Sequence, residues 1–248
     1  MKKGILVASF GTSYEETRIK CIDSIENLVK DKYGEDVFAR AFSSRIIRTK
    51  LKRRDNLHIN SPEEGLKELI DRGFDEIVTL SLHILDGIEY AKLSTEYGPV
   101  AKPLLYDEED YLRIVQDKEL NDLQGLDALV FMGHGSADEV ADQTYTKLQD
   151  AYHKEGHDNI YIGTVEGEIT IDDILASLKG KNIKSILLKP FMVVAGDHAQ
   201  NDMASEEEDS WKSILLAHGY DVTVDMRGMG EYKVVQEMFM EHLDAAMK

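Results

Sequence analysis

The chain has 248 residues, of which 42% are hydrophobic and 31% are charged, and this length allows one large domain or two smaller ones. Its 47 acidic and 29 basic residues give a formal net charge of −18, which argues against a general nucleic-acid binder because neutralising phosphates requires a basic face. With a single cysteine and no apolar run near the roughly 20 residues of a membrane span, we expect a compact cytoplasmic protein without disulfides or a membrane segment.

Short apolar runs alternate with longer amphipathic ones along the chain. Continuous apolar stretches such as Ile5–Ala8 are typical of strands buried on both faces of a parallel sheet. In chain order, the predicted strands are Gly4–Ser9, Val37–Phe42, Glu76–Leu82, Ala128–Met132, Ile160–Gly163, Ser185–Lys189 and Asp221–Asp225. The predicted helices are Tyr14–Lys30, Pro62–Arg72, Glu108–Val115, Ala137–Tyr152, Thr170–Lys179, Ala204–His218 and Glu231–Met247. This alternation predicts right-handed βαβ units and an α/β fold.

The two halves of the chain are similar to each other. The segment from Gly4 aligns with the segment from Leu126 when Gly11 is set on Gly135, an offset of 124 residues. We therefore predict two similar α/β lobes, residues 1–124 and 125–248, each a mainly parallel sheet flanked by helices. Open sheets bind ligands beyond the carboxyl ends of their strands, so the active-site cleft is expected between the lobes. The alternative is that any two βα units look alike.

Three residues that follow predicted strands carry the candidate chemistry. His134 replaces the Phe10 of the first half, and His198 aligns with Glu89 when Ser81–Glu89 is set on Pro190–His198. Glu166 follows a third strand. Two imidazoles and a carboxylate at neighbouring strand ends predict an open site for a borderline divalent metal ion. The alternatives are hydrogen-bonded turn histidines and, for Glu166, a cap for the helix predicted near Thr170.

Other common catalytic motifs are absent from the sequence. It has no Cys-x-x-Cys pair and no His-Glu-x-x-His helix, so we expect no structural zinc site. It has neither a phosphate-cradling Walker loop nor a complete dinucleotide fingerprint, so we expect no nucleotide and no use of ATP. It also lacks the Gly-x-Ser-x-Gly elbow of serine hydrolases.

Two clusters of charge admit two interpretations each. The stretch Arg40–Arg54 holds seven cations and no acid, which predicts either an anion-binding surface, for example for a polycarboxylate, or a solvated face or subunit contact. The run Glu206–Asp209, with Asp202 before it, follows His198 on a predicted helix. These acids either match the helix dipole or concentrate divalent cations beside the metal ligands.

Three segments, Met132–Ser136, Gly163–Gly167 and above all Pro190–Trp211, resemble the anaerobic sirohydrochlorin cobaltochelatases. These are ATP-independent class II chelatases of corrinoid synthesis. The similarity extends over essentially the whole chain, from Phe10–Ser13 to Gly228–Glu231. The resemblance implies a bilobal chelatase fold that holds a tetrapyrrole between its lobes.

The resemblance also implies roles for individual residues. His134 and His198 would bind the incoming cobalt(II), with Glu166 beside them. His134 would then act as the base that removes pyrrole protons. Cations of the first lobe and backbone donors near Thr12 and Ser13 would hold the carboxylates of the substrate.

The activity implied by the resemblance is insertion of cobalt(II) into sirohydrochlorin in anaerobic cobalamin biosynthesis, by a homo-oligomer that binds no nucleic acid. A His₂Glu site also accepts iron(II) and nickel(II), so a sirohydrochlorin ferrochelatase and a nickel chelatase are alternatives. A non-catalytic metal or haem carrier of the same bilobal shape is another. An unrelated α/β enzyme that uses the metal for hydrolysis remains open as well.

Overall fold

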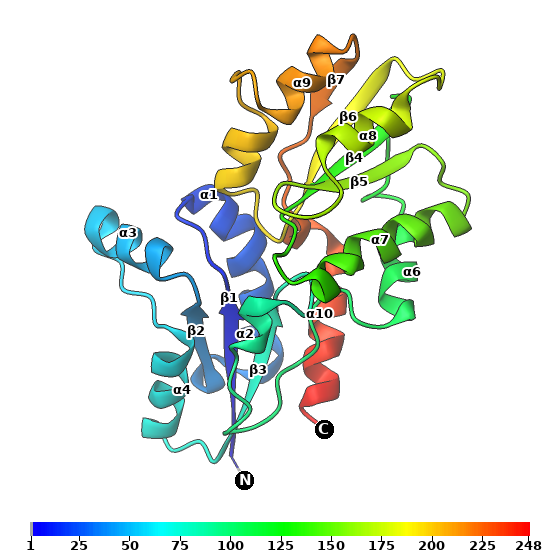
Figure 1. Cartoon of the computed structure of the whole chain (residues 1–248). Coiled ribbons are helices and arrows are strands. Elements are labelled where there is room, and N and C mark those ends of the chain that lie inside the picture. Colours follow the sequence, from blue (N-terminus) through cyan, green and yellow to red (C-terminus); the bar gives the residue numbers. More distant parts are fainter. Residues whose placement is uncertain (1) are drawn as a thin grey trace. The chain divides into compact units, whose positions relative to one another are not determined.

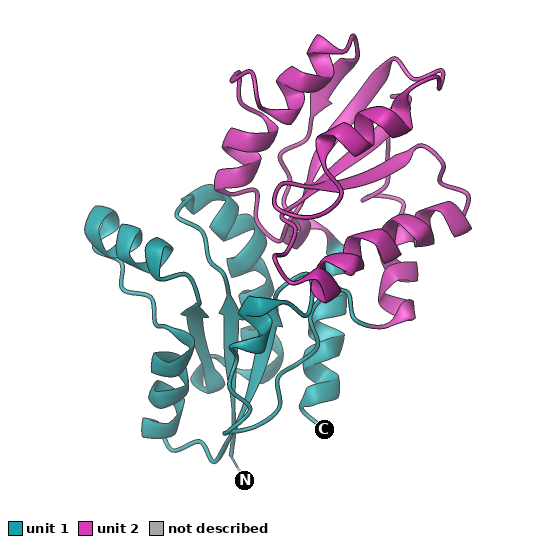
Figure 2. Ribbon diagram, in the orientation of Figure 1, with its two compact units in different colours: residues 1–106, 233–248 teal, residues 107–232 magenta. Residues whose placement is uncertain are grey.

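In the computed structural model, which describes residues 2–248, the chain divides into two units (Figure 2). Unit 1 contains residues 2–106 and 233–248, and unit 2 contains residues 107–232. Each unit is built on one parallel sheet with helices packed against it, which confirms the predicted fold class.

The sheet of unit 1 has the order β2-β1-β3, so the first strand lies in the middle (Figure 1). Its strands are β1 (Lys3–Ser9), β2 (Phe38–Phe42) and β3 (Glu76–Leu82). From Gly4 onward β1 is buried at every position, which agrees with the continuous apolar run in its sequence. Both neighbours pair with it in parallel, Ile5 opposite Phe38 and Val78.

The helices of unit 1 cover this sheet. They are α1 (Glu15–Thr17), α2 (Ser24–Tyr33), α3 (Arg45–Asp55), α4 (Pro62–Asp71), α5 (Ile88–Ala91) and α10 (Lys233–Ala246). The π-helical turn η1 (Arg18–Asp23) joins α1 to α2, and the 3₁₀ turn η2 (Glu35–Val37) precedes β2. Helix α4 begins as its sequence predicts, because the Ser61 hydroxyl accepts from the Glu64 amide while the Glu64 carboxylate accepts from the Ser61 amide.

Unit 2 has a four-stranded parallel sheet in the order β5-β4-β6-β7. Its strands are β4 (Ala128–Gly133), β5 (Ile160–Thr164), β6 (Ser185–Phe191) and β7 (Asp221–Val224). Its helices are α6 (Glu108–Gln116), α7 (Glu139–Lys154), α8 (Ile171–Leu178) and α9 (Trp211–Ala217), with the π-helical turn η3 (Ala199–Met203) and the 3₁₀ turn η4 (Met229–Glu231). All six residues of β4 are buried, and Met132 packs in a core that also includes Trp211.

The two units repeat the same topology around their first strands. Gly11 and Gly135 both adopt left-handed backbone, with φ of +89° and +88°. The amide of Ser44 donates to the Phe10 carbonyl, as the amide of Glu166 donates to the His134 carbonyl. The alignment of Gly11 with Gly135 therefore holds in three dimensions.

The units differ in two places from the expected division at residues 124 and 125. Helix α6 belongs to unit 2, and helix α10 returns to unit 1, where it contacts β3 and α2. The apolar face of α10, including Phe239 and Leu243, is fully buried there. An amphipathic pattern shows that a helix has a face to bury but does not identify the sheet that covers it.

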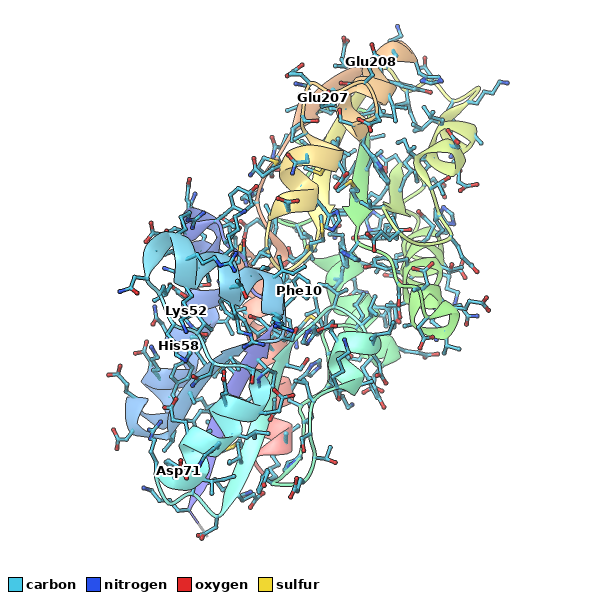
Figure 3. All side chains as sticks on the ribbon, turned by 60° about the vertical axis from the view of Figure 1, so that its left-hand side comes forward. Phe10, Lys52, His58, Asp71, Glu207 and Glu208 are labelled. Carbon is cyan, nitrogen blue, oxygen red and sulfur yellow. The ribbon has the colours of Figure 1, made fainter. Side chains whose placement is uncertain are left out.

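One predicted helix is shorter than expected, and two helices, α3 and α5, lie outside the predicted ones. The helix predicted over Ala204–His218 begins only at Trp211, because Ser210 is its N-cap and accepts a hydrogen bond from the Ser213 amide. The four acids Glu206–Asp209 therefore precede this helix in exposed turns (Figure 3). Helix α3 was not predicted, because Leu51 is its one fully buried residue and its apolar periodicity is weak.

Candidate metal centre

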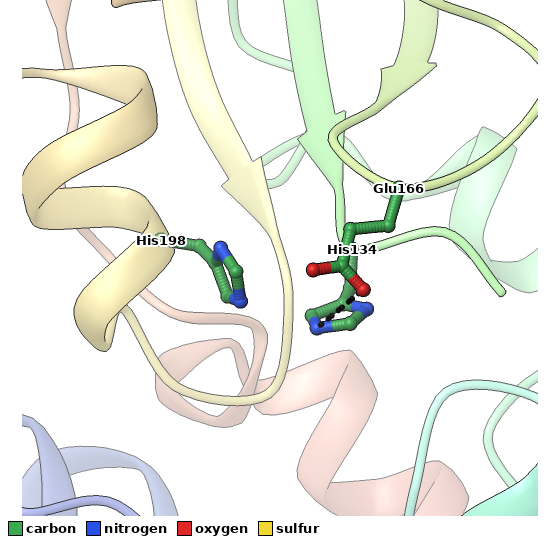
Figure 4. A group of neighbouring side chains, drawn as sticks. All are labelled: His134, Glu166 and His198. Atoms are coloured by element: carbon green, nitrogen blue, oxygen red, sulfur yellow. Dashed lines mark ion pairs between the residues drawn. The ribbon is translucent and has the colours of Figure 1, made fainter. Parts of the chain in front are cut away.

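The three predicted metal ligands all lie in unit 2, at the carboxyl edge of its sheet. His134 directly follows β4, Glu166 lies two residues beyond β5, and His198 lies on the segment between β6 and η3. Strands β5, β4 and β6 are neighbours in the sheet, and parallel strands end at the same edge. Figure 4 shows the three side chains gathered around one space.

One potential ligand atom from each residue can be chosen so that all three lie within 4.8 Å of one another. The Nε2 atom of His134 is 3.9 Å from Oε2 of Glu166, and the rings of His134 and His198 have centroids 4.6 Å apart at an angle of 90°. Donors bound to one tetrahedral ion at bonds of about 2.1 Å lie about 3.4 Å apart. Small side-chain rotations can therefore bring the three donors onto one ion. Within residues 2–248, no other group of His, Cys, Asp or Glu side chains has this geometry.

Hydrogen bonds fix the tautomer that each histidine adopts when its ring is neutral. The Nδ1 atom of His134 lies 3.1 Å from the Gly135 carbonyl oxygen, and Nδ1 of His198 lies 2.8 Å from Oδ2 of Asp202. Both partners are acceptors, so each Nδ1 carries the proton and donates it. The lone pair of each imidazole is then on Nε2, the arrangement that outer carboxylates and carbonyls impose on metal-binding histidines.

The candidate site is open on one side. The side chains of His134, Glu166 and His198 are 44%, 59% and 33% exposed. The helix-cap alternative for Glu166 is wrong, because Asp173 caps helix α8 by accepting from the amide and hydroxyl of Thr170. The site thus combines three donors with room for further ligands, as sites that exchange or react at the metal require.

The predicted substrate-binding residues Thr12 and Ser13 lie in unit 1, after β1, and are only 3% and 6% exposed. The Thr12 hydroxyl accepts from the Tyr14 amide at 3.2 Å, and the Ser13 carbonyl accepts from Nη2 of Arg54 at 2.7 Å. Both contacts are made within unit 1. Its contact with substrate stays a prediction.

The basic stretch separates into two parts. Arg40 is in β2, where its guanidinium binds the carboxylates of Glu26 and Asp23 and is not available to a ligand. The other six cations lie on α3. Ser44 before this helix and Asn56 after it are residue types that commonly begin and end helices, so they are sequence signals for α3. Six residues of this helix line a surface pocket of about 610 Å³. They form two rows in which successive residues are four positions apart, Arg45, Thr49 and Arg53 in one and Ile46, Lys50 and Arg54 in the other.

Sequence reasoning missed one residue beside the ligands. Asp142 is buried in helix α7 and contacts the loops that carry His134 and Glu166. In the sequence, Asp142 is an acid in the first turn of a predicted helix, and the exposed Glu139 fits the same description. Burial alone separates the two.

Comparison with known proteins places the chain among metal chelatases. A family profile described as "Cobalt chelatase (CbiK)" matches residues 3–248. The sirohydrochlorin cobaltochelatase of Salmonella typhimurium is 36% identical over 259 aligned residues, which cover 100% of this chain and 97% of that protein. The sirohydrochlorin cobaltochelatase CbiKC of Nitratidesulfovibrio vulgaris is 30% identical over 99% of this chain and 91% of its own length.

Solved structures agree at the level of the fold. SirB from Bacillus subtilis with Fe³⁺ superposes with a TM-score of 0.67 at 16% identity, covering 99% of this chain and 96% of that one. The sirohydrochlorin chelatase SirB from Bacillus subtilis subspecies spizizenii in complex with cobalt gives 0.64 at 14% identity, covering 99% and 95%. With a profile match over nearly its whole length and a full-length relative at 36% identity, the chain belongs to the cobalt chelatase family.

Proposed function

We propose that this protein inserts cobalt(II) into sirohydrochlorin without ATP, and that His134, His198 and Glu166 hold the incoming ion. The observation that carries the proposal is the exposed His₂Glu cluster in a chain of the cobalt chelatase family. Its full-length relatives named sirohydrochlorin cobaltochelatases support the choice of metal and tetrapyrrole.

The geometry suits temporary binding of a metal that is a substrate. The Nε2 atoms of two neutral histidines and one carboxylate replace some of the water around the ion, and the exposed side leaves positions for the macrocycle nitrogens. Asp202 keeps the Nδ1 proton of His198 in place, so the ring presents Nε2 throughout. A closed four-ligand site would instead retain the metal.

The same residues can also accept the protons that the macrocycle loses. Insertion of a divalent ion displaces two protons from the macrocycle, and these need acceptors as the ion leaves the protein. Once released from the metal, Nε2 of His134 has a free lone pair and can accept one of these protons. The Glu166 carboxylate, 3.9 Å away, takes the second proton or balances the charge.

Helix α3 is the proposed holder of the substrate's carboxylates, together with Thr12 and Ser13. Arg45, Lys50 and Arg53 line its pocket and have no carboxylate ion-pair partner among the described residues. The Arg54 contact to the Ser13 carbonyl links the helix to the loop after β1.

The remaining proposals concern the location of the protein, its assembly and its use of nucleotides. No helix in residues 2–248 has the length and apolarity to cross a membrane. We propose a cytoplasmic homo-oligomer that needs no nucleotide. Sedimentation and assays with and without ATP test the last two points.

The decisive experiment follows the absorbance of sirohydrochlorin anaerobically with protein and cobalt(II), with iron(II) and nickel(II) in parallel. We expect protein-dependent insertion, fastest with cobalt(II). His134→Ala should fold normally and lose most activity, because a ligand and the base disappear together. More than about half of the wild-type rate in this variant would refute the assignment of His134. Metal or tetrapyrrole binding without turnover would indicate a carrier, and faster iron or nickel insertion would indicate one of the other chelatases.

A further inference from the structure

Asp142 is a buried carboxylate that spans two loops. It lies on helix α7 and is 3% exposed. Its Oδ1 accepts a hydrogen bond from the Ser136 amide at 2.9 Å, and its Oδ2 accepts one from the Glu168 amide at 2.8 Å. Ser136 follows His134 by two residues, and Glu168 follows Glu166 by two. One side chain therefore holds both ligand loops by their backbones.

The two loops also touch each other directly at glycines. A Cβ atom on Gly135 would lie 2.4 Å from the amide nitrogen of Gly167, and a Cβ on Gly167 would lie 2.3 Å from Oδ1 of Asp142. Neither glycine can therefore be replaced without displacing a neighbour. The Tyr145 hydroxyl, whose pKa burial raises to about 12, is 3.4 Å from the Gly135 amide and accepts from it.

This bracing requires a carboxylate. Both contacts come from amide N–H groups, so the side chain must offer two acceptors and no donor, which an ionised aspartate does. An asparagine in the same place would turn an NH₂ group toward one of the two donors and leave that amide buried without a partner.

The repeat supplies an internal comparison. Helices α1 and α7 begin at Glu15 and Glu139, the same offset of 124 residues that relates Gly11 to Gly135. At that offset the position of Asp142 is occupied in unit 1 by Arg18. The carboxylate that bridges the two loops is thus found in the unit that carries His134 and His198.

We propose that Asp142 is a positioning residue that sets the spacing between His134 and Glu166, and so the metal affinity of the site. The inference rests on the proposed function, because it assumes that these residues share one ion. Asp142 acts on the metal through the two backbones and does not touch it.

Asp127, an exposed aspartate of the same unit, offers a control. It also accepts several hydrogen bonds, from the amides of Lys184 and Ser185 and from the Ser185 hydroxyl. It lies before β4, at the opposite end of the strand from His134. Asp127→Asn should therefore lower stability without changing the ligand loops.

The experiment titrates cobalt(II) anaerobically into wild type, Asp142→Asn and Asp127→Asn, following the visible absorbance of the bound ion, with urea unfolding of each. We expect Asp142→Asn to weaken cobalt binding by about 10- to 100-fold, as outer partners of metal ligands do when removed, and Asp127→Asn to leave it unchanged. In a Glu166→Gln background, Asp142→Asn should change the affinity by less than about threefold, since the spacing between the two ligands no longer affects binding once one of them is removed. If Asp142→Asn fails to fold, Asp142→Glu, which keeps both acceptors but moves them by a methylene, should show the same fall.

The outcomes separate the inference from the proposed function. Cobalt binding that is insensitive to His134→Ala and His198→Ala would refute the metal site itself. If those two variants lose cobalt but a folded Asp142 variant binds it within threefold of wild type, the positioning role is overturned. An equal loss in Asp127→Asn would reduce Asp142 to a contributor to stability, which also overturns it.

Discussion

Replacing Gly135 with alanine should impair the metal site, because the backbone of the Glu166 loop occupies the space that the added methyl group needs. The residue has φ of +88°, and its missing Cβ would lie 2.4 Å from the Gly167 nitrogen and 2.7 Å from the Glu166 carbonyl carbon. Both obstacles are backbone atoms of the Glu166 loop, so they cannot rotate away as a side chain can. The methyl group must push that loop from the His134 loop.

The structure sets the size of the effect. Left-handed backbone costs alanine about 1–2 kcal/mol, and relief of the overpacking costs about 1–3 kcal/mol more. Carbon atoms pack at about 3.5 Å, so the Glu166 loop must move by about 1 Å. The Glu166 side chain must compensate for this displacement to stay a ligand, so cobalt affinity should fall by at least about tenfold.

Gly219→Ala is the matched control. Gly219 belongs to the same unit and has φ of +89°, but nothing lies within 4 Å of the position of its Cβ. It should show the backbone cost of about 1–2 kcal/mol and normal cobalt binding. Urea unfolding measures the stability of both variants, and cobalt titration below the unfolding transition measures affinity. Equal destabilisation of the two variants, with wild-type cobalt affinity in Gly135→Ala, would refute the reasoning.

Three further predictions concern charged and titratable groups. Reversing Arg53 and Arg54 to glutamate should raise KM for sirohydrochlorin more than it lowers kcat, and an unchanged KM with altered assembly would make α3 a subunit contact. Neutralising the exposed Glu206–Asp209 together should slow insertion only at low cobalt and reduce its dependence on salt, whereas slowness that persists at saturating cobalt would place these acids in the site. Burial lowers the pKa of His83 to about 4, so the folded state binds fewer protons there than the unfolded state, whose pKa is about 6.5. The contribution of His83 to the free energy of unfolding should therefore be complete above pH 6.5 and should fall by up to about 3 kcal/mol as the pH drops towards 4. In urea unfolding, His83→Gln should weaken this dependence on pH. An unchanged dependence in the variant would show that another group causes it.

The sequence alone predicted the repeating strands and the three candidate metal ligands. Runs such as Ile5–Ala8 have no polar face, so they suit only a buried parallel strand, and all seven predicted strands are present. The two histidines and the glutamate each follow a strand, and parallel strands end at the same edge of a sheet. The sequence therefore predicted that the three residues lie at the carboxyl edge of one sheet. The structure brings these three side chains together.

Tertiary structure decided what local patterns leave open. The amphipathic face of α10 fits any apolar sheet surface, and only packing assigns it to β3 and α2 of unit 1. The cations of the Arg40–Arg54 stretch look alike in sequence, yet Arg40 binds the buried carboxylate of Glu26 while Arg53 lines a surface pocket. Asp142 likewise reads as an ordinary helix acid. Its role depends on two backbone amides 6 and 26 residues away, and contacts over such separations exist only once the chain has folded.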